Sequence, residues 1–174
     1  MITPQKEYAF IVVKNGIYIY PKNIRTDSMP DQVAQNWFLQ PNEVLLADWH
    51  THQDISTNLN DRPGPSDDDI IGIKTGAHQT QLNFVRFIEC GNVRYAFVIE
   101  NPTKAAAFFR NVTFGRLDVS EVYQNSLKNN PIRSTNYQQA GVEATIAVIG
   151  NSSTNGIALY MSTNPQKNQY VKLN

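Results

Sequence analysis

An apolar run that ends in two histidines, followed by a stretch rich in aspartate, is the feature that most constrains this chain. The run Val44–Ala47 continues through Asp48 and Trp49 to His50 and His52. A short apolar run of this kind is typical of a strand, and side chains i and i+2 of a strand project to the same face. The segment therefore predicts a strand that carries both imidazoles on one side, where together they can bind one metal ion.

The aspartate-rich stretch begins with Ser66, which is followed by three aspartates and two isoleucines. Serine is a favoured N-cap, and the helix dipole favours carboxylates in the first turn, so we expect a short helix here. A carboxylate of that turn can supply a third, oxygen ligand. Asp67, Asp68 and Asp69 are the candidates, and which of them faces the histidines depends on the residue at which the helix begins. Two histidines and one carboxylate leave a zinc position open for water, as in catalytic zinc sites.

Composition limits the other classes of function. The chain has 174 residues, of which 41% are hydrophobic and 17% charged, so we expect residues 1–174 to form a single globular domain. The formal net charge is zero, which gives no electrostatic support for nucleic-acid binding. The single cysteine, Cys90, excludes an intrachain disulfide, and we expect it to serve in packing rather than as a nucleophile.

There is no signal-peptide pattern and no apolar run long enough to span a membrane. Two cellular locations of the protein stay open. It can remain in the cytoplasm, or it can be exported by a non-classical route as part of an effector.

The first part of the chain is β-rich. An Asn-Gly pair joins the runs Tyr8–Val13 and Ile17–Tyr20, and Asn-Gly between two such runs indicates a hairpin. The third strand, which delivers the histidines, is expected at Glu43–Trp49. Between the hairpin and this strand, Pro21–Pro41 is expected to hold at most one short helix, near Asp31–Phe38.

The rest of the chain mixes strands and helices. Four further strands are expected, at Leu82–Glu89, Val93–Glu100, Ile157–Ser162 and Gln169–Leu173. Four helices are expected, one from Ser66 to near Gly72 or Gly76, and the others at Pro102–Arg110, Ser120–Lys128 and Asn136–Ile149. Because strands and helices do not alternate regularly, the pattern indicates an α+β fold with a mixed central β-sheet and flanking helices.

The order Glu7, His50-x-His52 and Ser66-x-x-Asp69 resembles the signature of the JAMM/MPN+ (JAB-like) zinc metallopeptidases. In the details of Glu7-Tyr8, Trp49–His52 and Ser66–Ile70, the chain is most similar to the branch found at the ends of bacterial Rhs and other polymorphic-toxin proteins. The resemblance covers residues 7–76. It implies a JAB/MPN-like domain with the α/β/α layering of cytidine deaminases.

The resemblance also implies the roles of five residues. Zinc would be held by His50, His52 and Asp69 with one water, whose pKa zinc can lower to about 7. Glu7 would be the general base that activates this water and later protonates the leaving amine. Ser66 would donate a hydrogen bond to the tetrahedral oxyanion, and one such donor contributes about 3 kcal/mol.

Metal-binding histidines usually donate their second ring N–H to an outer partner. Asp48 and Asp54 are the two candidates close in sequence.

The chain differs from the family pattern in three places. Gln53 follows the second histidine, where many members have proline. The polar loop Gln53–Pro65 is longer than its counterpart in the eukaryotic deubiquitinating members, and we expect it to form a flap that shapes substrate choice. Family domains usually carry a helix before the strand that begins with the glutamate, whereas Glu7 is almost at the start of this sequence. We therefore expect that the chain is either a piece of a larger polypeptide or a domain that lacks this helix.

The resemblance implies hydrolysis of an amide bond by a zinc metallopeptidase or isopeptidase, in a bacterial toxin, an effector or a processing domain. The expected partners are a protein or peptide substrate, with a cognate immunity protein or a larger parent polypeptide, and neither nucleic acid nor membrane. Two alternatives stay open. One is a zinc amide hydrolase that acts on peptidoglycan, and the other is a non-catalytic MPN-like protein-binding module.

Overall fold

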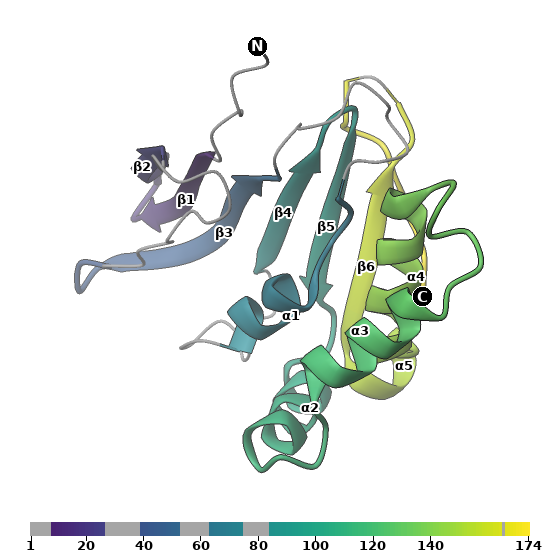
Figure 1. Ribbon diagram of the computed structural model, residues 1–174. Helices are drawn as coiled ribbons and strands as arrows, with labels where there is room; N and C mark the ends of the chain where they lie inside the picture. Colours follow the sequence, from purple (N-terminus) through teal and green to yellow (C-terminus); the bar gives the residue numbers. More distant parts are fainter. Residues whose placement is uncertain (1–7, 27–38, 53–62, 75–83, 165) are drawn as a thin grey trace.

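The computed structural model describes residues 8–26, 39–52, 63–74, 84–164 and 166–174. These residues form one seven-stranded sheet and five helices (Figure 1). In their order across the sheet, the strands are β2 (Tyr18–Thr26), β1 (Tyr8–Asn15), β3 (Glu43–Thr51), β4 (Val85–Cys90), β5 (Val93–Ile99), β6 (Ile157–Ser162) and β7 (Tyr170–Lys172). The helices are α1 (Asp67–Lys74), α2 (Pro102–Thr113), α3 (Val119–Lys128), α4 (Tyr137–Ile149) and α5 (Ser152–Asn155).

The sheet is mixed. Neighbouring strands are antiparallel except for β3 and β4, which pair in parallel with His50 opposite Ile88. Helix α1 lies between these two parallel strands in the sequence. The predicted α+β class, with a mixed sheet and flanking helices, is confirmed.

The N-terminal hairpin is confirmed, with Gly16 in the left-handed region at a φ of +59°. The second strand is longer than predicted, because β2 continues through Pro21 to Thr26 instead of ending at Tyr20. Pro21 is tolerated because β2 is an edge strand, where a missing N–H does not interrupt a central ladder. The helix expected at Asp31–Phe38 lies outside the described residues.

The C-terminal half agrees closely with the predicted elements. Asn101, Asp118 and Asn136 each accept a backbone N–H of the following turn and so cap α2, α3 and α4. One element was missed: Ser152–Asn155 form the short helix α5. Gly156 ends α5 with a φ of +71°.

The core joins one face of the sheet to the helices. Buried sheet residues, among them Ile11, Ile88 and Phe97, share one cluster with buried residues of every helix from α1 to α4. Helix α4 is apolar on most of its circumference and lies alongside β6 (Figure 1). None of the helices in the described ranges is long and apolar enough to cross a membrane.

The segment just before α1 is fixed between helices α3 and α4. The carbonyl of Pro65 accepts hydrogen bonds from the hydroxyls of Tyr123, at 3.0 Å, and Thr145, at 3.2 Å. A Cβ atom at Gly64 would lie 2.6 Å from the backbone oxygen of Gln138, so only glycine fits against α4 here. These contacts fix the chain immediately before Ser66 and thus the start of α1.

Candidate metal centre

The two histidines lie where β3 ends beside β4. His50 is the penultimate residue of β3, pairs with Ala9 of β1 and Ile88 of β4, and is buried. His52 follows the strand, and its backbone N–H donates to the carbonyl of Glu89 at 2.9 Å. The strand pairing is therefore extended by one residue, and both imidazoles are held at the carboxyl end of β3.

The carboxylate comes from the first turn of α1. Ser66 caps this helix: its backbone N–H and its hydroxyl donate to Oδ2 of Asp69 at 2.7 and 2.9 Å, and its Oγ accepts the Asp69 N–H at 3.4 Å. This reciprocal pattern is a capping box with aspartate at N3. Asp69 is buried whereas Asp68 is exposed, so the helix begins where predicted and directs Asp69 inward.

Three candidate ligand residues converge at this point. His50 Nε2 lies 2.8 Å from Asp69 Oδ1, His52 Nε2 lies 3.3 Å from Asp69 Oδ2, and the two Nε2 atoms are 3.3 Å apart. A tetrahedral zinc ion with bonds of about 2.0–2.1 Å would separate its ligand atoms by about 3.3 Å. The buried group of His50, His52 and Asp69 can therefore bind a metal ion. The predicted ligand residues are brought together.

The charges of the group are strongly coupled. Burial opposes the ionisation of Asp69, but the neighbouring His52 and His50 outweigh it and hold the pKa of this carboxyl well below its ordinary value. Burial likewise disfavours the charged form of His52, yet Asp69 and the nearby Cys90 raise the pKa of His52 well above its ordinary value. Both shifts favour an ionised Asp69 carboxylate and, in the absence of a metal ion, a protonated His52 beside it.

The outer nitrogen atoms of the two histidines differ in their surroundings. Nδ1 of His52 lies 3.7 Å from the sulfur of Cys90, a buried thiol whose pKa burial raises. Nδ1 of His50 is buried and has no hydrogen-bond partner among the described residues. Asp48 does not fill this outer role, because its fully buried carboxylate pairs with Arg86. The alternative, Asp54, lies outside the described residues.

The two residues expected to act in catalysis have different outcomes. Ser66 lies beside Asp69, one of the candidate metal ligands, with its hydroxyl directed at the Asp69 carboxylate. Its role as an oxyanion donor stays a prediction. Glu7 lies outside the described residues. The next residue, Tyr8, opens β1, and its N–H donates to Thr51 Oγ1 at 3.0 Å.

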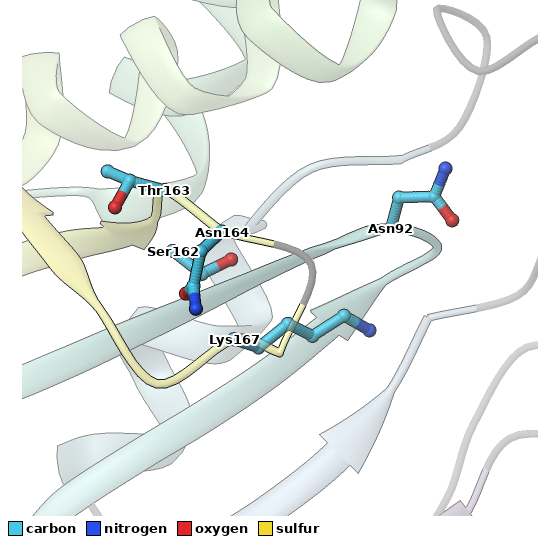
Figure 2. A pocket seen from close by; sticks show the side chains of 5 residues that line it. All are labelled: Asn92, Ser162, Thr163, Asn164 and Lys167. Atoms are coloured by element: carbon cyan, nitrogen blue, oxygen red, sulfur yellow. The ribbon is translucent and has the colours of Figure 1, made fainter.

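A separate cavity of about 590 Å³ lies between the turn that joins β4 to β5 and the loop that follows β6 (Figure 2). It is lined by Asn92, Ser162, Thr163, Asn164 and Lys167. The ammonium of Lys167 pairs with Glu89 and donates to the Gly91 carbonyl, while the Asn164 amide binds neighbouring residues of its own loop. Because the side chains of Lys167 and Asn164 already have partners, the group of His50, His52 and Asp69 is the stronger candidate for a functional site.

Comparisons of the chain with protein-family models, with curated proteins and with solved structures found no match. What can be said of function thus depends on the site itself.

Proposed function

We propose that this protein is a metal-dependent amide hydrolase, a zinc metallopeptidase or isopeptidase of the JAMM type. The observation that carries the proposal is the convergence of His50 Nε2, His52 Nε2 and an oxygen of Asp69, all buried or nearly so, within the reach of one ion. Two imidazoles and one carboxylate are the ligand set of catalytic rather than structural zinc. The site also lies at the carboxyl end of a parallel strand pair, a common place for ligands in sheets with parallel strands.

Ser66 binds only one of the two Asp69 oxygens. Oδ2 accepts both the N–H and the hydroxyl of Ser66 and lies 3.3 Å from His52 Nε2, whereas Oδ1 faces His50 and is left for the ion. If the Ser66 hydroxyl turns toward a substrate, its backbone N–H still holds Oδ2. Ser66 can therefore donate to a developing oxyanion without releasing the ligand, which fits the role that the resemblance implies.

The bound metal would polarise the scissile carbonyl and make a water molecule more acidic. In the proposed reaction Glu7 takes the proton of this water as general base and later gives it to the leaving amine, so that the amide bond is replaced by a carboxylate and an amine. The roles proposed for His50, His52, Asp69 and Ser66 also have support from their positions in the structure. The role of Glu7 rests on the resemblance alone. The substrate class proposed is a protein or peptide, in the setting of a bacterial effector or processing domain.

The first experiment measures the metal content of the purified protein by mass spectrometry, beside the double variant His50→Ala/His52→Ala. We expect about one zinc ion per wild-type chain and none in the double variant. His78→Ala is the matched control, because His78 is the remaining histidine of the sequence. It should keep the metal.

Metal-loaded protein is then tested on isopeptide-linked and linear peptides and on peptidoglycan. Cleavage of peptides that stops on chelation supports the proposal. Cleavage of peptidoglycan alone would favour the cell-wall hydrolase. A wild-type protein that takes up no metal, even from added zinc, would refute the proposal and favour a non-catalytic binding module.

A further inference from the structure

A buried arginine of β4 connects the two elements that carry the metal ligands. Arg86 is 3% exposed. Its Nε and Nη2 donate to the carboxylate of Asp48 at distances of 2.6 to 3.1 Å, and its Nη1 donates to the backbone carbonyl of Asp69 at 2.8 Å. One guanidinium therefore contacts strand β3 and the first turn of α1 at the same time.

The two contacts are close to the ligands along the chain. Asp48 precedes His50 by two residues on β3 and so lies on the same face of the strand. The carbonyl bound by Nη1 belongs to Asp69 itself. Because the guanidinium is planar and its donors form a rigid fork, the contacts fix the distance between the histidine strand and the carboxylate helix.

The sequence of α1 accommodates this arginine. A Cβ atom at Gly72 would lie 2.0 Å from Nη1 of Arg86 and 2.9 Å from its Cζ. Glycine in a helix interior is less favourable than alanine by about 1 kcal/mol. The helix thus has a destabilising residue at a position where a side chain would displace the guanidinium.

We propose that Arg86 is a positioning residue of the metal site, which holds Asp69 at the distance from His50 and His52 that one ion requires. This inference rests on the proposed function, because it assumes that the three residues bind metal. A buried ion pair such as Arg86–Asp48 is by itself weak evidence for a role in stability. The hydrogen bond from Arg86 to the Asp69 carbonyl is the contact that distinguishes a positioning role from a purely structural ion pair.

Two variants test this contact. Arg86→Lys keeps the positive charge beside Asp48, but a single ammonium cannot reproduce the fork that also reaches the Asp69 carbonyl. Gly72→Ala keeps Arg86 and displaces its Nη1 end. Zinc affinity is measured by competition with a chromophoric chelator, and the free energy of unfolding of the metal-free proteins is measured in urea. We expect zinc affinity to fall by about 10- to 100-fold in both variants, as for other outer partners of metal ligands.

Arg94→Lys is the matched control. Arg94 pairs with Glu89 at 2.8 Å on the neighbouring strand and is remote from α1 in its contacts, so its replacement should leave zinc affinity unchanged. The visible spectrum of the cobalt-substituted proteins adds a readout of ligand geometry. A shift in the spectrum of Arg86→Lys or Gly72→Ala, but not of Arg94→Lys, supports a positioning role.

The inference is overturned if both test variants are folded by circular dichroism and bind zinc as the wild type does, with an unchanged cobalt spectrum. If Arg86→Lys does not fold, Gly72→Ala decides the question alone. A wild-type protein that binds no zinc refutes the proposed function and this inference together. If instead the wild type binds zinc and the variants bind it equally well, the inference about Arg86 fails while the proposed function stands.

Discussion

Nδ1 of His52 lies 3.7 Å from Sγ of Cys90, the last residue of β4. When the Nε2 atom of a neutral imidazole binds a metal, the proton must be on Nδ1, and this N–H needs an acceptor. Among the residues that the structure describes, the Cys90 sulfur is the acceptor within reach. A buried cysteine that sequence patterns assign to packing therefore contacts a candidate metal ligand.

Replacing Cys90 with valine removes the acceptor while it keeps an apolar side chain of similar size. We expect Cys90→Val to bind zinc about 10-fold more weakly than the wild type, because the ring of His52 loses its outer partner. Cys90→Ser retains an acceptor and should bind zinc more tightly than the valine variant. Equal affinities for all three proteins, measured by chelator competition, would contradict this role for the thiol.

The metal-free protein should lose stability as the pH rises above neutrality. The pKa of His52 is raised in the folded state, so its contribution is complete below its unfolded pKa of about 6.5 and is lost as the pH rises through the raised value. The pKa of Asp69 is lowered, so its contribution is present above about 4 and is lost as the pH falls through the lowered value. Together the two contributions predict that the free energy of unfolding of the metal-free protein is largest between about pH 4 and 6.5.

Urea unfolding in the presence of a chelator, at a series of pH values, measures this dependence. His52→Gln should lack the decline on the alkaline side, and so should the wild type with saturating zinc, because the ion replaces the proton. A decline of the same size in His52→Gln would assign it to other groups.

The two halves of the candidate metal group could each be predicted from the sequence because each depends on local geometry. The alternation of a strand places His50 and His52 on one side, and the three-residue spacing of a helix cap brings Ser66 to Asp69. Each relationship spans two or three residues and needs no knowledge of the tertiary fold. The same locality explains why the hairpin at Gly16 was predicted.

The supporting residues could not be predicted, because they depend on which strands are neighbours. Arg86 and Cys90 reach the site only because β4 pairs in parallel with β3, with Arg86 opposite Asp48. Nothing local in the sequence fixes this pairing or its register. For the same reason Asp48, a nearby carboxylate in the sequence, was considered as a partner of the histidines and is instead the partner of Arg86.

The cap of α1 should affect both stability and metal binding. Ser66→Ala removes the hydroxyl that donates to Asp69 Oδ2 and accepts the Asp69 N–H. We expect the free energy of unfolding to fall by about 1 kcal/mol, the usual effect of losing a serine cap, and zinc affinity to fall as well. Asp118→Ala is the control, since Asp118 caps α3 through the Glu121 N–H at 2.9 Å. It should lower stability by a similar amount with zinc affinity unchanged. Equal zinc affinities for both variants would mean that Ser66 does not orient the ligand.

Glu7→Gln separates the proposed general base from the metal ligands. Glutamine is close to glutamate in size but cannot accept a proton at neutral pH, so the variant should bind zinc with wild-type affinity and lose amide hydrolysis. The expected loss of kcat is about 10²- to 10⁴-fold, the usual contribution of a positioned general base. Zinc content and turnover are measured on the same preparation, so that a loss of activity is not confused with a loss of metal.

Glu121→Gln is the matched control for Glu7→Gln, because Glu121 is an exposed glutamate in the first turn of α3. This variant should keep both zinc and turnover. A Glu7→Gln protein that retains zinc and full activity would show that another group takes the proton. If it loses zinc instead, Glu7 belongs with the residues that hold the ion, and the base must be sought elsewhere in the chain.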